Sequence, residues 1–310
     1  MPRVLVTGSA GLIGRPLCAA LRLAGYAVKG FDLRVAGDGR QVADDEYGDV
    51  RDAASLRRAM TGCDGVIHLA AMSRVLEAES APEACHATNV GGVRNVLAAI
   101  DVAGRHAEPW LVFASSREIY GNPASLPADE DTPAQPINRY AASKVEGERL
   151  LAAAAAGGRR AMIVRFSNVY GSVADYPDRV VPAFAMAAAH GGRLVVRGPD
   201  QVLDFTHIED LVRGLLRLVA VFGDARVDVP TLHFVTGRGT SLGELAAMSA
   251  AHSATGCEVV EAPKTGIHVG RFIGCGARAR RWLDWAPEIE IEDGLRRLVQ
   301  SYADRRGQAA

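Results

Sequence analysis

The sequence lacks an excess of charge of either sign and lacks a long uncharged hydrophobic run. Its 310 residues carry 35 lysines and arginines against 36 aspartates and glutamates, for a formal net charge of −1. Such a chain has no overall basic field that would attract DNA, RNA or anionic lipid. No uncharged apolar run reaches the roughly 18 residues that a membrane span needs. We therefore predict that the protein binds neither nucleic acid nor membrane.

The sequence also lacks paired cysteines. The five cysteines are Cys18, Cys63, Cys85, Cys257 and Cys275. They form no CxxC pair and have no histidine nearby at a zinc-ligand spacing, so we expect reduced thiols and no metal site.

Because residues 3–7 already read as a strand, no room is left for an export signal ahead of them, and we expect a cytoplasmic protein. At 48% hydrophobic residues, the composition is too apolar for a disordered chain.

Strand-like and helix-like patterns alternate through the first half of the chain. Strands are expected at 4–6, 26–31, 65–69, 110–114 and 161–166, and helices at 11–24, 53–60, 82–103 and 139–156. This βα winding predicts a Rossmann-type α/β fold, a doubly wound parallel sheet with helices on both faces. Beyond residue 170, glycine and proline turns, a capping box from Ser241 to Glu244 and late helices near Ala277 and Glu292 predict a smaller C-terminal α/β lobe.

The 33 glycines include a glycine-rich turn, TGSAGLIG at residues 7–14, between the first strand and the first helix. Gly8 permits the tight turn, Gly11 lets the backbone approach a pyrophosphate, and Gly14 allows close packing of the helix on the strand. The helix N-terminus adds unpaired N–H donors. Asp32 follows at the end of the second strand, where the ribose diol of a dinucleotide needs an acceptor. The pattern predicts a dinucleotide site and favours NAD over NADP, because Asp32 would repel a 2′-phosphate.

A tyrosine and a lysine lie four residues apart on a predicted helix, at Tyr140 and Lys144. This spacing places both side chains on one face, so the ammonium favours the phenolate, helped by the positive nicotinamide of NAD. Moving a phenol pKa from about 10 toward about 7 requires roughly 4 kcal/mol, which two cationic neighbours in a dry site can supply. Ser116 ends the preceding strand. These three residues predict a general base, its tuning cation and a hydroxyl that orients the same substrate oxygen.

Further motifs follow the glycine turn in a fixed order. They are Asp49 with Val50, HLAA at 68–71, NVGG at 89–92, RFSNVYG at 165–171, VVPAF at 180–184, DFTHIED at 204–210 and LDWAP at 283–287. With the TGxxGxxG spacing, they resemble the extended short-chain dehydrogenase/reductase superfamily over nearly the whole chain. Within it, the chain is similar to the NAD-dependent nucleotide-sugar epimerases and dehydratases.

This resemblance implies roles for named residues. The implied cofactor-binding residues are Gly8, Gly11, Leu12, Ile13, Gly14, Asp32, Asp49, Val50, Leu69, Ala70, Ala71, Asn89, Ala114, Tyr140, Lys144 and Phe166. The implied or candidate contacts of a nucleotide sugar are Ser116, Arg117, Tyr140, Asn168, Arg179, Val181, Phe205, Lys264 and Arg271. One position departs from the family, because Leu203 stands where relatives carry an arginine for the diphosphate. Arg179, Lys264 and Arg271 are the alternatives for the missing cation.

The resemblance also implies a domain arrangement. Residues 1–170 are expected to form an NAD-binding Rossmann domain to which 203–236 returns, while 171–202 and 237–310 form a nucleotide-sugar-binding lobe. In this family the helices that contain Asn89 and Tyr140 often pair across a two-fold axis into a four-helix bundle, so a homodimer is expected.

The leading functional expectation is a UDP-sugar 4-epimerase with Ser116, Tyr140, Lys144 and Glu118 as the catalytic set. UDP-glucuronate is one candidate substrate, since Arg117 suits a carboxylate. The alternative is a UDP-uronate decarboxylase or a nucleotide-sugar dehydratase that uses Glu118, although an arginine cannot be the proton donor of a 4,6-dehydratase. Glu118 is equally well read as the ion-pair partner of Arg117. A non-catalytic NAD sensor is a third reading, and the Ser116, Tyr140 and Lys144 set argues against it.

Overall fold

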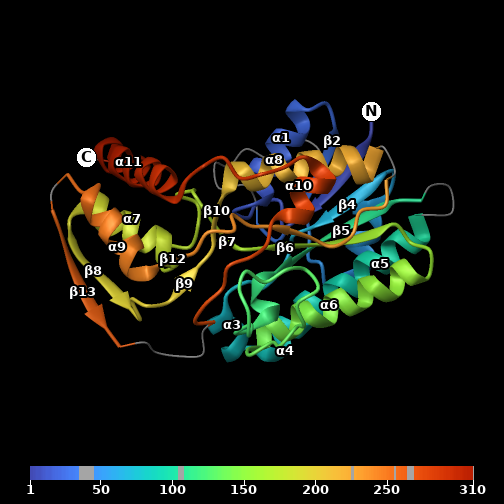
Figure 1. Cartoon of the computed structure of the whole chain (residues 1–310). Coiled ribbons are helices and arrows are strands. Elements are labelled where there is room, and N and C mark those ends of the chain that lie inside the picture. Colours follow the sequence, from blue (N-terminus) through green and yellow to red (C-terminus); the bar gives the residue numbers. More distant parts are fainter. Residues whose placement is uncertain (35–44, 104–107, 225–226, 255, 264–268, 310) are drawn as a thin grey trace. The chain divides into compact units, whose positions relative to one another are not determined.

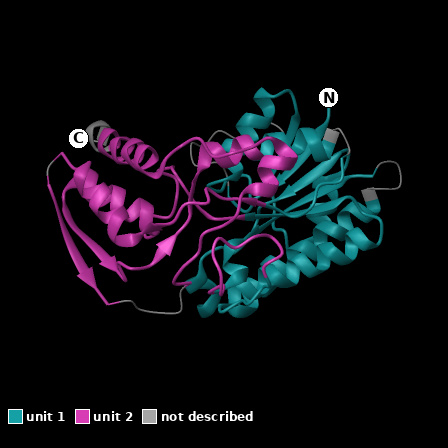
Figure 2. Ribbon diagram, in the orientation of Figure 1, with its two compact units in different colours: residues 1–121, 133–165, 215–232 teal, residues 122–132, 166–214, 233–310 magenta. Residues whose placement is uncertain are grey.

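The computed structural model describes residues 1–34, 45–103, 108–224, 227–254, 256–263 and 269–309. These residues divide into two compact units, coloured in Figure 2. Unit 1 comprises residues 1–121, 133–165 and 215–232, and unit 2 comprises residues 122–132, 166–214 and 233–310. The chain therefore passes between the units several times.

Unit 1 is built around a seven-stranded sheet. Its strands are β1 (Arg3–Thr7), β2 (Ala27–Asp32), β3 (Glu46–Tyr47), β4 (Gly65–His68), β5 (Trp110–Ser116), β6 (Ala161–Phe166) and β11 (Leu232–Phe234), in the order β11-β6-β5-β4-β1-β2-β3. The pairs β1–β2, β2–β3, β1–β4 and β4–β5 are all parallel. The strand order reverses beside β1, as in doubly wound folds, which bind ligands outside the carboxyl ends of their strands. The predicted Rossmann-type fold is confirmed.

Helices cover both faces of this sheet, with α1 (Gly14–Leu23) on one side and α5 (Gly92–Ala103) and α6 (Arg139–Ala156) on the other (Figure 1). The chain also forms α2 (Ala53–Met60), α3 (Val75–Ser80), α4 (Pro82–His86), a 3₁₀ turn η2 (Arg117–Tyr120) and a π-helical segment η3 (Val219–Asp224). Apolar residues from β1, β2, β4 and β5 pack with α2, α5 and α6 into one core cluster that includes Leu5, Leu56, Val96 and Phe113. This burial fixes the ends of the strands, where the predicted site residues lie.

The long helix predicted over 82–103 is divided in the structure. A π-helical segment, η1 (Ala87–Gly91), separates α4 from α5. Asn89 lies in this segment with a fully buried side chain. A π-helical turn widens a helix locally and is frequent at functional sites. Hydropathy periodicity does not report such a turn, because the apolar face continues through it.

Unit 2 has three small strand pairs packed with helices. Its strands are β7 (Asn168–Tyr170), β8 (Gly192–Arg197), β9 (Val202–Leu203), β10 (Phe205–His207), β12 (Thr240–Ser241) and β13 (Cys257–Ala262). β10 pairs with β7 and β13 with β8 in parallel, while β12 pairs antiparallel with β9. Its helices are α7 (Val180–His190), α9 (Leu242–Ala251), α10 (Ala277–Leu283) and α11 (Ile291–Ala309), and α8 (Ile208–Leu218) begins in it.

One apolar cluster holds unit 2 together and includes Tyr170, Phe184, Leu245 and Leu298. The predicted capping box at the start of α9 is present, because Ser241 Oγ accepts from the Glu244 N–H and the Glu244 carboxylate accepts from the Ser241 N–H. Such a box satisfies two N–H groups that a helix start leaves unpaired.

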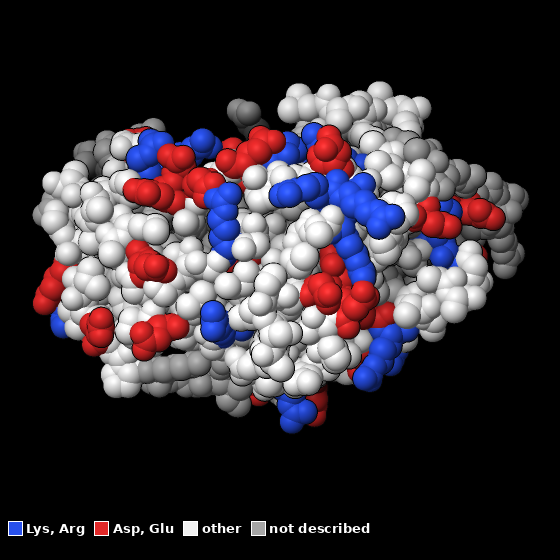
Figure 3. Space-filling model, in the orientation of Figure 1, with Lys and Arg blue, Asp and Glu red and all other residues white. Residues whose placement is uncertain are grey.

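Charged side chains of both signs lie side by side at several points on the face drawn in Figure 3. Within the described part of the chain, no helix has the length and apolar character needed to cross a membrane. In the same residues, no group of three or more His, Cys, Asp or Glu side chains could hold a metal ion.

Candidate active site

The turn that follows β1 is built on glycines whose missing side chains leave room for close contacts. Gly8 has φ +74°, and a Cβ there would lie 2.8 Å from the Ala70 nitrogen. A Cβ on Gly14 would lie only 2.1 Å from the Gly8 oxygen, so this position also excludes a side chain. Gly11 is less crowded, its Cβ meeting the Gly8 oxygen at 3.1 Å. Ile13, the N-cap residue of α1, makes no side-chain hydrogen bond to the helix, so that end carries no side-chain cap.

Asp32 lies beside this turn at the end of β2. Its Oδ2 accepts from the Ala10 N–H at 2.9 Å and its Oδ1 accepts from the Arg34 N–H at 2.9 Å. The carboxylate therefore ties the glycine turn to the second strand. The Arg34 guanidinium lies 3.5 Å from the same Oδ1 and is largely exposed. Its charge is partly offset by Asp32, which lessens its suitability for a 2′-phosphate.

Two further segments, after β3 and after β4, carry implied cofactor residues. Asp49 accepts hydrogen bonds from the backbone and guanidinium of Arg51, which lower the pKa of its carboxyl. Val50 is buried, and its carbonyl accepts from Asn95. After β4, the Leu69 N–H donates to the Thr7 carbonyl. The implied cofactor residues Leu69, Ala70 and Ala71 are all half-buried.

His68, at the end of β4, is buried. Its Nδ1 and the Thr7 Oγ1 share a hydrogen bond of 2.7 Å. Burial, together with the charge of Lys144, lowers the pKa of His68 to about 3. The imidazole is therefore neutral at physiological pH and adds no charge behind the turn.

The open backbone turn, the uncapped helix start and the acidic residue at the end of β2 suit an anionic dinucleotide. Phosphates bind well at such a helix end, where N–H groups and the helix dipole both favour negative charge. The residues present therefore fit the expected NAD site.

Tyr140 and Lys144 lie on the first turns of α6, and both are buried. Lys144 Nζ donates to the Ala114 carbonyl oxygen at 2.8 Å and lies 4.8 Å from the centre of the Phe113 ring. It also lies 5.9 Å from the centre of the Tyr140 ring, so the predicted pair is brought together. Burial lowers the pKa of Lys144 to about 8, which leaves it mostly charged at neutral pH.

Ser116, Arg117 and Glu118 form the turn that follows β5. Ser116 Oγ accepts from the Glu118 N–H at 3.2 Å. The Glu118 carboxylate pairs with Arg117 at 2.8 Å and accepts from Asn138 Nδ2 at 2.9 Å. Asn138 also caps α6, since its Oδ1 accepts from the Ala141 N–H. The sequence analysis missed Asn138, although an N-cap residue two positions before Tyr140 was a usable signal.

Asn89 makes its hydrogen bonds within the chain. Its Oδ1 accepts from the Met72 N–H at 2.8 Å, and its Nδ2 donates to the Met72 carbonyl and to Ser143 Oγ. Ser143 Oγ in turn donates to the Tyr140 carbonyl. Asn89 thus connects the segment after β4 with the helix that carries Tyr140. Neither Met72 nor Ser143 was singled out from the sequence.

The candidate substrate residues in unit 2 lie on several elements. Asn168 pairs with Phe205 in the β7–β10 register, and its Nδ2 donates to the Asp204 carbonyl. Val181 and Phe205 are buried in the apolar cluster, as is Leu203. Arg179 precedes α7 and lies 3.5 Å from Asp175.

Three more residues of the implied and candidate sets are Arg271, Phe166 and Lys264. Arg271 is exposed, and its backbone forms an isolated β-bridge with Val202. Phe166 is buried and contacts the Phe234 ring. Lys264 lies outside the described residues.

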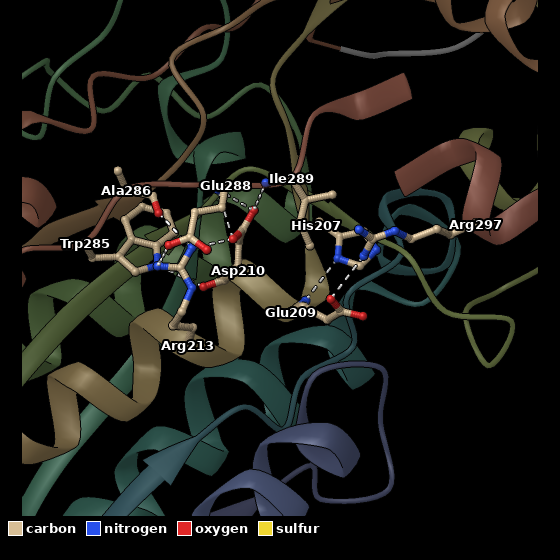
Figure 4. A network of polar contacts seen from close by, with 9 residues as sticks. All are labelled: His207, Glu209, Asp210, Arg213, Trp285, Ala286, Glu288, Ile289 and Arg297. Carbon is tan, nitrogen blue, oxygen red and sulfur yellow. Dashed lines mark hydrogen bonds and ion pairs between the residues drawn. The ribbon is translucent and has the colours of Figure 1, made fainter. Parts of the chain in front are cut away.

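The DFTHIED motif ends in an anchoring carboxylate in unit 2 (Figure 4). Asp210 is buried, and its oxygens accept from the N–H groups of Glu288 and Ile289 and from Arg213. Its carbonyl accepts from the indole of Trp285 at 2.9 Å. Two motifs far apart in the sequence, DFTHIED and LDWAP, are therefore joined by hydrogen bonds.

Known proteins are similar to this chain over most of its length. A family model described as the NAD dependent epimerase/dehydratase family matches residues 4–227. A dTDP-glucose 4,6-dehydratase of Streptomyces griseus is 31% identical over 98% of this chain and 94% of its own length. A UDP-glucose 4-epimerase of Streptomyces lividans is 31% identical over 92% of this chain and 91% of its own. The crystal structure of a UDP-glucose 4-epimerase from Stenotrophomonas maltophila, with bound NAD and formylated UDP-arabinopyranose, matches with TM-score 0.88 at 25% identity over all of both chains.

Proposed function

This chain belongs to the NAD dependent epimerase/dehydratase family, and from that premise we propose that it is an NAD-dependent UDP-sugar 4-epimerase. The family match and the relatives with epimerase activity support a nucleotide-sugar substrate. The identities of the nucleotide and of the sugar are also part of this proposal. A UDP-hexose is favoured over UDP-glucuronate, because the Arg117 that would meet a uronate carboxylate is already ion-paired with Glu118.

The observation that carries the proposal is the arrangement on α6 and at the end of β5. Tyr140 and Lys144 are held together by burial, and Lys144 is fixed to the Ala114 carbonyl. A buried phenol near a fixed ammonium is suited to act as a base, because the positive charge favours the phenolate. A non-catalytic binding protein has no need of this arrangement.

Each residue of the arrangement has a proposed task. Tyr140 takes the proton from the C4 hydroxyl and returns it after the sugar has presented its other face. Lys144 stabilises the phenolate, and Ser116 donates to the same substrate oxygen. The Ser116 Oγ already accepts from the Glu118 N–H, which leaves its hydrogen for donation. Bound NAD would supply a reversible hydride acceptor for C4, so the overall reaction would involve no net redox change.

The proposed cofactor contacts lie in unit 1. The turn at Gly8, Gly11 and Gly14 would receive the pyrophosphate, and Asp32 would accept from the adenosine ribose. Asp49, Val50 and the segment 69–71 would line the adenine and nicotinamide portions, as the family resemblance implies. Unit 1 is thus the proposed NAD-binding domain.

The proposed nucleotide-sugar contacts lie mainly in unit 2. Leu203 is buried in the apolar cluster, so no cation is available at that position for the diphosphate. Arg179 and Arg271 are the described cations that we propose as its replacement. Arg271 is the better placed of the two, because its side chain is exposed and no ion pair is found for it among the described residues, while Arg179 lies beside Asp175.

The dehydratase alternative depends on Glu118 acting as an acid or base. Both of its oxygens are engaged, one by Arg117 and one by Asn138. With both oxygens bound inside the protein, the carboxylate is held away from proton transfer with a substrate. This supports simple epimerisation over elimination or decarboxylation.

Two further parts of the proposal concern the assembly and the compartment. We propose a homodimer formed through α5 and α6, which lie side by side on one face of the sheet (Figure 1). Exposed small side chains such as Ala98 and Ala142 are compatible with close helix packing there. Light scattering of the purified protein checks the dimer. We also propose that the protein works in the cytoplasm.

Product NMR on a panel of UDP-, dTDP-, GDP- and CDP-sugars tests the function. The proposal predicts that one UDP-sugar equilibrates with its C4 epimer in the wild type. Loss of CO₂ or a stable 4-keto product would instead identify the decarboxylase or dehydratase. No conversion of any UDP-hexose or UDP-uronate would refute the proposal.

A further inference from the structure

Asn138 joins the two elements that carry the candidate catalytic side chains. Its Nδ2 donates to Glu118 Oε2 at 2.9 Å, on the turn that begins at Ser116. Its Oδ1 accepts from the Ala141 N–H at 2.8 Å, in the first turn of the helix that carries Tyr140. We call this pair of hydrogen bonds the Glu118–Asn138 link.

The chain that connects these elements runs partly through the other unit. The chain leaves unit 1 after Gly121 and returns at Pro133, because residues 122–132 belong to unit 2. Two further hydrogen bonds join this part of unit 1: the Gln135 N–H donates to the Ile119 carbonyl, and Lys144 Nζ donates to the Ala114 carbonyl, just before the turn. Among these contacts, the Glu118–Asn138 link is the one that joins a side chain of the Ser116 turn to the cap of α6.

The carboxylate in the link is well anchored. Glu118 and Arg117 are mostly buried, with 13% and 9% of their side chains exposed, and they lie 2.8 Å apart. A buried carboxylate that accepts from a guanidinium and an amide is held in one position. The N–H of the same residue donates to Ser116 Oγ, so fixing Glu118 also fixes the direction of the Ser116 hydroxyl.

We propose that Asn138 is a positioning residue that, through Glu118, sets the place of Ser116 relative to Tyr140. The proposal rests on the proposed function, in which both side chains must reach one substrate oxygen. It assigns to Glu118 a positioning task in place of proton transfer. A displacement of about 1 Å at a reacting centre can cost about 100-fold in rate.

The test compares two replacements of Asn138. In Asn138→Ser the hydroxyl can still cap α6, but it is too short to hold Glu118 as well. In Asn138→Ala both the cap and the link are lost. The difference between Asn138→Ser and the wild type therefore isolates the link, while the difference between the two variants isolates the cap.

Hydrogen exchange of the folded protein needs no substrate and is the first measurement. The proposal predicts that amides of residues 117–121 exchange at least about tenfold faster in Asn138→Ser, while α6 keeps its protection. Unchanged exchange at 117–121 would overturn the proposal. Because this readout does not involve turnover, it stays decisive even if the wild type converts none of the UDP-sugars.

Kinetics supply the second measurement. Asn138→Ser and Glu118→Gln are each expected to lower kcat about 10- to 100-fold with KM changed less than about threefold, because the ground-state contacts remain. Combining them should cost little more than either alone, since they break one link. A wild-type kcat in Asn138→Ser would overturn the proposal. So would a double variant whose loss in kcat is the product of the two single losses, or a loss beyond about 1000-fold in Glu118→Gln alone.

Discussion

The ammonium group of Lys144 donates a 2.8 Å hydrogen bond to the carbonyl oxygen of Ala114. The bond ties the buried face of α6 to the end of β5, next to Ser116. It also fixes a positive charge 5.9 Å from the centre of the Tyr140 ring. The proposed base and its cation are therefore positioned by the end of β5, and the buried charge of Lys144 affects stability as well as activity.

Replacing Lys144 with Met should change how stability depends on pH. The pKa of Lys144 falls from 10.5 to about 8 on burial, so between these pH values the unfolded chain keeps a proton that the folded chain has released. The free energy of unfolding of the wild type therefore rises with pH through this window. Relative to Lys144→Met, the wild type should gain about 3 kcal/mol between pH 7 and pH 10.5. Urea unfolding of both proteins measures this difference, and a constant difference across the window would contradict it.

Removing the hydroxyl of Tyr140 should abolish turnover without loss of structure. General acid–base catalysis contributes about 10²- to 10⁴-fold, so Tyr140→Phe should lower kcat by about 1000-fold. Tyr170→Phe is a matched control, because the Tyr170 hydroxyl is buried with no hydrogen-bond partner among the described residues. That variant should be as active as the wild type and at least as stable. Equal activity of Tyr140→Phe and the wild type would exclude Tyr140 as the base.

A side chain at Gly14 should disrupt the cofactor turn. Its Cβ would lie 2.1 Å from the Gly8 oxygen, so the turn must shift in Gly14→Ala. We expect a loss of about 1–3 kcal/mol in stability and at least tenfold weaker NAD binding. Gly91→Ala is the control, since a Cβ there meets nothing within 4 Å. Calorimetric titration with NAD measures the affinity of both variants. Equal affinities would contradict the role of the turn in NAD binding.

Removing the Asp210 carboxylate should destabilise unit 2. Asp210→Ala leaves two backbone N–H groups and Arg213 without their acceptor (Figure 4). Losing one partner of a buried charged network costs about 3–5 kcal/mol. Asp293→Ala, which breaks the exposed pair with Arg296, should stay within about 0.5 kcal/mol of the wild type. Similar unfolding midpoints for the two variants would contradict the anchoring role of Asp210.

Local sequence signals predicted the elements that depend on local chemistry. The glycine turn at 7–14 was predicted from the spacing of its glycines, and in the structure Gly8 has a positive φ and Gly14 has no room for a Cβ. The helices over 53–60 and 139–156 have the predicted bounds, the first starting at the cap Asp52 and the second at Asn138. Such caps and turns are encoded within a few residues of the element that they terminate.

Contacts between distant residues were not predictable in the same way. In the π-helical turn, the Asn89 side chain is hydrogen-bonded to Met72 and Ser143, which lie 17 and 54 residues away. The Glu118–Asn138 link spans 20 residues, and the Asp210 contacts span 78 and 79. Periodicity carries no information on such pairs, because each partner reads as an ordinary polar residue within its own segment.

The central claim is that the sugar is oxidised at C4 and reduced again at the same carbon. The most direct test follows a UDP-sugar labelled with deuterium at C4, taken from the pair that the wild type interconverts. The account predicts that the C4 epimer retains the deuterium at C4, takes up no solvent hydrogen at carbon, and is not formed by Tyr140→Phe. Loss of the label from C4 in the product, or solvent hydrogen at C5, would contradict it.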